Sequence, residues 1–413
     1  MRILWVKANK IFPVHSGGDL RSFHILQELA RRHEVTFLSY YDGAVDERYE
    51  REVEERLPGA LCVCTGNRKD STMARGLDYL THALDDAPYA VGRFASAIVR
   101  KELKRCLAEP EPDVVVCDFL DAAINFPERL TAPSVLFQHN VESEIWRRHA
   151  EAETNGAKRL LYRRECRRML SYEKVAVRKF HHVIAVSEHD RRLMSEWVDA
   201  ARITVVPTGV DLQQYGPENS GCEPEPLVMF TGAMDWEPNI DAMEYFCRDI
   251  WPGVRAAVPA ARLRVVGRNP GRRVLDLASD SVEVTGRVPS VVEHLQQAAV
   301  VVVPLRIGGG TRLKIYEAMA AGKAVVSTTV GAEGLDVHDG RDIILADSPQ
   351  AFRDSVVALL QDRDLRRRYE RAAAELAAGC GWPAVASKFE AVLQQVAGMA
   401  ASVSEELAPA AGN

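Results

Sequence analysis

The stretch from Val300 to Gly322 constrains the fold of this 413-residue chain more than any other part of it. Val300–Val303 is an unbroken run of valine, which is typical of a buried strand. A short turn leads to three glycines, Gly308–Gly310, and then to a run of helix formers that stops at Gly322. A strand, a glycine loop and a helix start in this order indicate one βα unit of a parallel sheet.

The same stretch has the chemistry of a phosphate site. The N–H groups at a helix start lack backbone partners and attract anions, and glycine lets the backbone approach a ligand closely. Arg312 and Lys314 add cationic donors, and Glu317, one turn further on, offers a carboxylate to a ribose diol. We therefore interpret the stretch as a nucleotide-diphosphate site. The alternative is an ordinary strand-to-helix turn with solvated charges.

Composition and charge narrow the class of protein. The length predicts two or three domains, and 47% hydrophobic with 27% charged residues fits a globular chain. A net charge of −6 argues against a nucleic-acid partner. The cysteines are scattered without the spacing of a zinc site, so we expect reduced thiols and no metal. A short apolar N-terminus and the absence of a long apolar run predict a cytoplasmic location.

The order of strands and helices predicts an α/β protein with two doubly wound, Rossmann-like domains. Ile3–Val6, the turn containing Gly17 and Gly18, a helix over 22–32 and the strand Val35–Tyr40 form a βαβ unit. Such sheets bind ligands outside the carboxyl ends of their strands, so we expect both glycine loops to face a central cleft. The expected parts are a first domain over 1–205, a second over 206–380, an amphipathic helix over 381–400 and a frayed tail over 401–413.

An ordered set of short motifs resembles the retaining glycosyltransferases of family 4, which have the GT-B fold with a C-terminal helix that crosses back to the first domain. The motifs run nearly from end to end: Gly17-Gly18, Gln138-His139-Asn140, Ala185–Asp190, Val206–Asp211, Phe230–Met234, Val265–Gly267, Thr285–Val288, Val300–Gly322 and Gly331–Leu335. The continuation Asp235–Asp241 is similar to a bacterial subgroup associated with exopolysaccharides.

The resemblance implies roles for residues of the second domain. Glu317 matches the second Glu of the family's Glu-x7-Glu motif and would bind the nucleotide ribose. The amides at Gly310 and Thr311, beside Gly309, would meet the donor phosphates. Arg287 and Val288 would flank the base by main-chain contacts.

The first domain would supply further contacts. His139 matches a histidine that contacts the donor sugar near the reacting carbon, and Gly17 and Gly18 match a loop that touches phosphate and acceptor. Asp19 has two interpretations, an acceptor contact or a helix cap. Asp118 and Asp121 follow a strand, and we expect them to cap the next helix rather than to face the cleft.

The chain departs from the family pattern at two places. The first Glu of the motif is replaced by Gly309, which weakens the expected recognition of the donor sugar. Family members also commonly carry an Arg and a Lys after the strand that opens the second domain, and Gly232–Asp241 contains neither. We hypothesise that Arg312 and Lys314 supply the missing positive charge as catalytic residues.

These patterns predict a metal-independent, hexosyltransferase-like enzyme. It would move a sugar with retention from a nucleotide-sugar donor to a saccharide or lipid-linked acceptor in bacterial polysaccharide biosynthesis, without a cofactor. The alternative is a catalytically weak GT-B protein that binds nucleotide or glycan without transfer. A sugar-nucleotide 2-epimerase and a nicotinamide dehydrogenase fit less well, because their carboxylates and Gly-x-Gly-x-x-Gly loop are not recognisable.

A basic amphipathic stretch over 158–179 predicts a further partner. Its Lys and Arg side chains alternate with apolar residues, a pattern that suits peripheral contact with an anionic membrane on its inner face. The alternative is a solvated helix that packs on its own domain.

Overall fold

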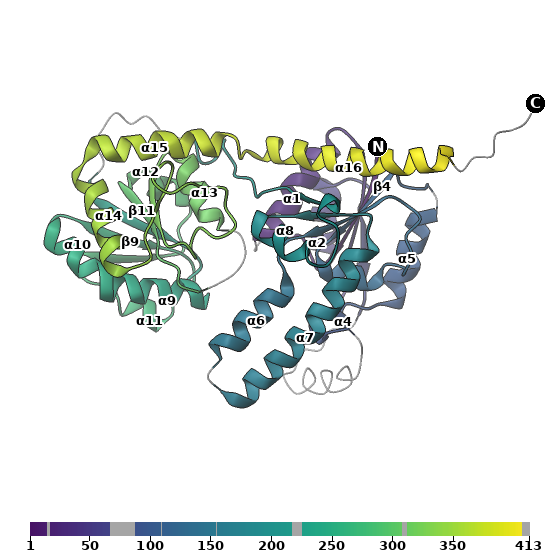
Figure 1. The fold of residues 1–413 in the computed structure, drawn as a ribbon, viewed down its shortest axis with the longest axis horizontal. Coiled ribbons are helices and arrows are strands. Elements are labelled where there is room, and N and C mark those ends of the chain that lie inside the picture. Colours follow the sequence, from purple (N-terminus) through teal and green to yellow (C-terminus); the bar gives the residue numbers. More distant parts are fainter. Residues whose placement is uncertain are drawn as a thin grey trace, which may run out of the picture. The chain divides into compact units, whose positions relative to one another are not determined.

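The computed structural model describes residues 1–14, 17–66, 87–108, 110–153, 155–216, 225–307 and 312–406, except the side chains of 152 and 400–406. The chain divides into two compact units (Figure 1). The first unit contains Met1–Pro207 and the chain from Val385 onward, and the second contains Thr208–Ala384. Each unit is built on one parallel sheet.

The first unit holds a parallel sheet in the order β3-β2-β1-β4-β5-β6-β7. Its strands are β1 (Arg2–Ala8), β2 (Glu34–Tyr41), β3 (Leu61–Cys64), β4 (Val114–Asp118), β5 (Ser134–Gln138), β6 (His182–Ala185) and β7 (Ile203–Val205). The residues of β4 and β5 are buried throughout, as expected of central strands covered on both faces.

Helices connect these strands. They are α1 (Gly17–Ala30), α2 (Glu47–Arg56), α4 (Tyr89–Gly92), α5 (Ala97–Ala108), α6 (Glu142–Ala152), α7 (Gly156–Lys179) and α8 (Glu188–Met194), with the short turns η1 (Leu120–Asn125) and η2 (Ala200–Arg202). Helices α6 and α7 lie side by side as a hairpin (Figure 1). Its base is fixed by buried Glu173 of α7, which accepts hydrogen bonds from the N–H groups of Glu142 and Ser143 at 2.7 and 3.1 Å. Glu173 thereby caps a helix to which it does not belong.

The second unit repeats the arrangement with a parallel sheet in the order β10-β9-β8-β11-β12-β13. Its strands are β8 (Leu227–Thr231), β9 (Arg262–Val266), β10 (Val282–Gly286), β11 (Val300–Val303), β12 (Ala324–Ser327) and β13 (Ile344–Leu345). Its helices are α9 (Glu237–Tyr245), the wider turn η3 (Phe246–Ile250), α10 (Trp251–Ala257), α11 (Arg272–Leu275), α12 (Val291–Gln297), α13 (Leu313–Ala320), α14 (Pro349–Gln361) and α15 (Arg363–Ala378).

The predicted α/β class with two Rossmann-like domains is confirmed, because both sheets are parallel and have the strand order of that fold. One strand was not predicted and one local prediction was wrong. Leu61–Cys64 forms a strand that carries no clear sequence pattern, because it is short and only half-buried. Gly17 and Gly18 lie in the first turn of α1 and not in a loop before it, because the first helical turn tolerates residues of low helix propensity. The expected cleft between the domains stays a prediction.

The C-terminal helix α16 (Trp382–Glu406) begins in the second unit and packs on the first from Val385 onward. It continues past residue 400, where the sequence predicts the frayed tail. Phe389 is fully buried and stacks on Trp5 with a centroid distance of 5.4 Å. It meets Phe137 edge to face at 4.9 Å, and Glu390 accepts a hydrogen bond from His33 at 2.8 Å. The last helix is therefore part of the core of the first unit.

Replacing this aromatic anchor tests the dependence of the first unit on α16. We expect Phe389→Ala to lower the free energy of unfolding by about 3–5 kcal/mol, because it removes a ring from a closed aromatic cluster. Urea titration would measure the loss. The exposed neighbour Gln395→Ala, which touches no part of this cluster, should change stability by less than about 0.5 kcal/mol. Equal effects of the two substitutions would contradict the assignment.

Candidate functional site

In each sheet the strand order reverses beside the first strand, between β1 and β4 in one unit and between β8 and β11 in the other. Connections leave such a pair of strands in opposite directions, and their carboxyl ends are the usual position of a ligand site. Several of the residues singled out from the sequence fall at these two points.

Lys314 occupies the reversal point of the second unit. It lies in the first turn of α13, and its Nζ reaches across to the segment after β8, where it donates to Asn239 Oδ1 at 2.9 Å. The same Nζ lies 4.2 Å from the centroid of the Phe230 ring, a cation–π contact. Burial lowers the pKa of Lys314 to about 7, with a further contribution from Arg312 and an opposing one from Glu317. The amine is thus held in a poorly hydrated position, where its charged form is disfavoured.

Glu317 follows Lys314 by three residues, so both side chains project from one face of α13. Burial raises the pKa of Glu317, and the neighbouring Tyr215 hydroxyl and Lys314 ammonium oppose this rise. Arg312, just before α13, is buried, and its guanidinium donates to the Val330 carbonyl at 3.4 Å. The predicted trio of Arg312, Lys314 and Glu317 is therefore gathered at one helix start.

The carboxyl ends of β8, β9 and β10 approach one another closely. The N–H of Gly232 donates to the Val266 carbonyl at 3.0 Å, and the N–H of Gly267 donates to the Gly286 carbonyl at 3.2 Å. A Cβ on Gly267 would lie 1.7 Å from the Gly232 oxygen, so only glycine fits there. Arg287 follows this edge and is exposed, and Val288 is half-buried. The predicted phosphate contacts Gly309, Gly310 and Thr311 lie outside the described residues.

The reversal point of the first unit holds a buried charge network around Asp118. Its carboxylate accepts from Trp5 Nε1 at 3.0 Å and from His139 Nε2 at 2.7 Å, and Lys7 Nζ lies 3.6 Å away. Burial alone would raise the pKa of Asp118, but Lys7 and His139 outweigh it and hold the pKa at about 2. The expectation that Asp118 caps the next helix was wrong, because the cations and donors around it use the carboxylate in the core.

His139 has both ring nitrogens engaged within the first unit. The Arg21 guanidinium, which can only donate, lies 2.7 Å from Nδ1, so the ring proton is on Nε2 and points to Asp118. Burial lowers the pKa of His139 to about 4, so the ring is neutral at pH 7. It also stacks on Phe119 with a centroid distance of 3.7 Å. A sugar that contacted an imidazole nitrogen would have to replace one of these two hydrogen bonds.

Gly18 is fixed by packing against Phe119. A Cβ at Gly18 would lie 2.3 Å from the end of the Phe119 ring, which is too close for any other residue. Phe119 itself has a positive φ of 68°, an unfavourable conformation for a bulky side chain. Lys7 Nζ lies 4.0 Å from the ring centroid, so the strained residue is held from several directions. Packing against Phe119 therefore explains the glycine at position 18 without a ligand.

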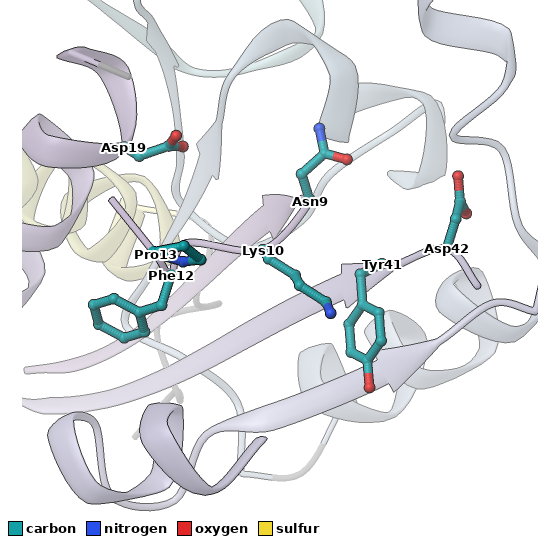
Figure 2. Close-up of a pocket in the computed structure, with 7 residues that line it drawn as sticks. All are labelled: Asn9, Lys10, Phe12, Pro13, Asp19, Tyr41 and Asp42. Atoms are coloured by element: carbon teal, nitrogen blue, oxygen red, sulfur yellow. The ribbon is translucent and has the colours of Figure 1, made fainter. Parts of the chain in front are cut away.

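A pocket of about 440 Å³ opens beyond the carboxyl ends of β1 and β2. Figure 2 shows the side chains that line it. The Lys10 side chain extends toward the Tyr41 ring and pairs with Asp46. Asp19, which pairs with Lys7 at 3.2 Å, contributes another charged side chain. The lining residues are Asn9, Lys10, Phe12, Pro13, Asp19, Tyr41 and Asp42. Carboxylate, amide and aromatic groups around one small space suit a ligand with several hydroxyl groups.

Several residues that take part in these contacts were not predicted from the sequence. Lys7 is a charged residue within an apolar strand, a pattern that could have marked it as paired in the core. Asn239 lies in the segment that lacks the expected cations, but an amide there carries no recognisable pattern. Tyr215 and Arg21 gave no usable pattern either, because their partners are distant in sequence.

Two family models match successive parts of the chain. Residues 16–214 match the model described as Glycosyltransferase Family 4, and residues 225–362 match Glycosyl transferases group 1. The chain is 30% identical over 224 residues to a phosphatidyl-myo-inositol mannosyltransferase of Mycobacterium leprae, covering 52% of this chain and 59% of that protein. It is 32% identical over 229 residues to a D-inositol 3-phosphate glycosyltransferase of Nocardia farcinica, covering 48% and 49%. The matches thus span about half to three fifths of these relatives.

The fold also has solved counterparts. The crystal structure of HepE from Anabaena in complex with UDP superposes with a TM-score of 0.65 at 14% identity, covering 96% of this chain and 100% of that one. At this identity the likeness concerns the fold alone. Because the two family models match the two units in order, this chain belongs to the superfamily of GT-B glycosyltransferases of group 1 and family 4.

Proposed function

We propose that the protein transfers a sugar, with retention, from a nucleotide-diphosphate sugar to a saccharide or lipid-linked acceptor in cell-surface or exopolysaccharide biosynthesis. The observation that carries this proposal is the position of Lys314. Its Nζ lies at the carboxyl end of β8, on the segment where the sequence lacks the family's usual Arg and Lys. The motif resemblance supports the exopolysaccharide role.

The chemistry needs positive charge at the leaving group. Negative charge develops on the β-phosphate as the glycosidic bond breaks, and fixed cations near it lower the barrier. Lys314 and Arg312 would supply that charge without a metal ion, and Glu317 would accept hydrogen bonds from the ribose. Retention without a side-chain nucleophile would follow from attack of the acceptor on the face that the phosphate leaves, with the phosphate oxygen taking the acceptor proton.

The donor and acceptor classes draw support from the relatives. HepE was crystallised with UDP, so UDP is the first nucleotide to test, followed by GDP and ADP. The curated relatives are named for acceptors based on inositol, one of them a lipid. The pocket lined by Asn9, Asp19 and Asp42 is the proposed acceptor position in the first unit, because its polar groups suit hydroxyls. His139 is a proposed contact of the donor sugar, as the motif resemblance implies. Such a contact would replace one of the two hydrogen bonds that the His139 ring makes with Arg21 and Asp118.

A second candidate is a GT-B protein that binds nucleotide or glycan with little transfer. Gly309 favours it, because the carboxylate that the family uses at that position is missing. Release of nucleoside diphosphate from a donor, with and without acceptor, separates the two. Nucleotide binding without turnover on any of a panel of UDP-, GDP- and ADP-sugars would favour this candidate.

Substitution of Lys314 tests the donor side. We expect Lys314→Ala to lower kcat by about 10²–10³, the typical effect of removing one donor that stabilises charge in a transition state. Lys314→Arg should retain part of the activity, because it keeps the charge but cannot occupy the same narrow space. The measurement is the release of nucleoside diphosphate at saturating donor.

The control for this substitution is Arg272→Ala, which removes a cation of the same unit that is 93% exposed and pairs with the exposed Asp276 in the next turn. It should leave turnover unchanged. If Lys314→Ala also retained full turnover while the protein remained folded, the proposed role of Lys314 in the reaction would be wrong.

We also propose that the tip of the α6–α7 hairpin contacts an anionic membrane. Leu160 is 70% exposed and Leu161 40% exposed, and exposed Lys158 and Arg159 flank them. Apolar side chains beside cations match the chemistry of a charged lipid surface. Among the helices of the described part, none has both the length and the apolar character needed to cross a bilayer. A lipid-linked acceptor would make such peripheral contact useful.

Vesicle pelleting tests this contact. We expect the protein to pellet with phosphatidylglycerol vesicles at low salt and to be released at high salt, because exposed charges are screened. Lys158→Glu with Arg159→Glu should abolish pelleting. Val45→Ser, which removes another exposed apolar side chain, should not alter it. A wild-type protein that stays in the supernatant at low salt would refute the proposal.

A further inference from the structure

Asn239, the third residue of α9, fixes the position of the Lys314 ammonium. Its Nδ2 donates to the carbonyl of Ala233 at 2.9 Å, which settles the orientation of the amide. The Oδ1 atom is therefore turned to Lys314 Nζ, from which it accepts at 2.9 Å. Asn239 is only 8% exposed, so neither hydrogen bond is readily replaced by water.

The space around this contact is closed by Gly232 at the end of β8. A Cβ there would lie 2.7 Å from Asn239 Nδ2 and 2.8 Å from Lys314 Nζ. Any side chain at Gly232 would therefore displace the amide or the ammonium. The Phe230 ring covers another side of the ammonium. The glycine, the amide and the ring together form a seat that fits the end of a lysine side chain.

Few charges act on the seated ammonium. Arg312 repels it and Glu317 attracts it, both at or near the start of α13. On the side of β8 and α9 its described neighbours are the neutral Phe230, Gly232 and Asn239. The amide supplies a dipole but no charge, so the ammonium lacks a full negative partner on that side. A ligand with negative charge at this position would provide one.

We propose that Asn239 is a positioning residue that seats Lys314 at the carboxyl end of β8, where the ammonium receives the diphosphate of the donor. This assignment rests on the proposed function for the identity of the ligand, while the seat itself concerns the ligand-free protein. Binding of the diphosphate stabilises the charged form of the amine and draws a proton onto it whenever the amine is neutral. Donor binding and proton uptake are then coupled.

The direction of the pH effect follows from the free protein. The pKa of Lys314 is lowered to about 7 by burial, so the amine is charged below pH 7 and increasingly neutral above it. Above pH 7, binding of a ligand that prefers the charged form requires the amine to take up a proton from solvent, so the affinity falls as the pH rises, by up to about tenfold per unit. With Asn239→Asp, a carboxylate replaces the amide oxygen and the pKa of Lys314 rises. The fall in affinity then begins at higher pH.

The seat is tested first without any ligand. In protein labelled with ¹³C at lysine Cε, the resonance that is missing from the spectrum of Lys314→Arg belongs to Lys314. The chemical shift of this resonance is followed as a function of pH. We expect its midpoint near pH 7 in the wild type and a clearly higher midpoint in Asn239→Asp. Gln297→Glu makes the same change of amide to carboxylate beside Arg264, and should leave the midpoint unchanged. A wild-type midpoint near that of free lysine, or equal midpoints in all three proteins, would overturn the seat.

The ligand step is tested by calorimetric titration with UDP, GDP and ADP between pH 6 and 9. The best binder should lose about tenfold in affinity from pH 7.5 to 8.5 in the wild type and less in Asn239→Asp. Asn239→Leu, which keeps the volume but neither hydrogen bond, should bind at least tenfold more weakly at pH 7. Affinity that is independent of pH in all proteins would refute the coupling. If no nucleotide bound at all, the proposed function would fail, while the lysine titration would still decide the seat.

Discussion

The central constraint in this structure is a lysine amine held away from water, which lowers its pKa to about 7. Lys314 emerges from the start of α13, an end of a helix that already carries partial positive charge, and Arg312 stands beside it. Burial raises the pKa of Glu317, one turn further along α13, and so weakens its compensation of the lysine charge. Basic groups are thus concentrated at the carboxyl edge of the sheet, which is a property expected of an anion site.

In the first unit, by contrast, buried charged groups are paired with one another. The buried charges around Asp118 are matched within the protein: Asp118 is surrounded by Lys7, Trp5 and His139, and His139 is in turn held by Arg21. A buried pair without such partners would be costly, because desolvation outweighs a single weak attraction. The groups of this network already have hydrogen-bond or ion-pair partners within the protein. The polar groups that remain toward solvent, such as Asn9 and Asp42, belong to the adjoining pocket.

Glycine illustrates why a motif and its explanation can differ. The sequence motif predicts that Gly17 and Gly18 form a ligand-binding loop. In the structure, the Phe119 ring approaches Gly18 too closely for a Cβ at that position. At Gly232, a Cβ would displace the side chain of Lys314 or Asn239 from its present position. In both units a glycine makes room for a side chain from elsewhere in the chain: Gly18 does so in the first turn of α1, and Gly232 at the end of β8. A glycine motif in the sequence does not show whether the missing Cβ makes space for a ligand or for another side chain of the protein.

The sequence by itself determined the two parallel sheets, nearly all of their strands and the gathering of Arg312, Lys314 and Glu317. Runs of apolar residues and the spacing along one helix are local properties, so they can be read without the fold. Only the tertiary structure decided that Lys314 reaches Asn239 and that His139 is neutral with both ring nitrogens hydrogen-bonded. It also decided that α16 completes the hydrophobic core of the first unit. Those facts depend on pairs of residues brought together from distant parts of the chain, and burial and Coulomb forces act on such pairs only after folding.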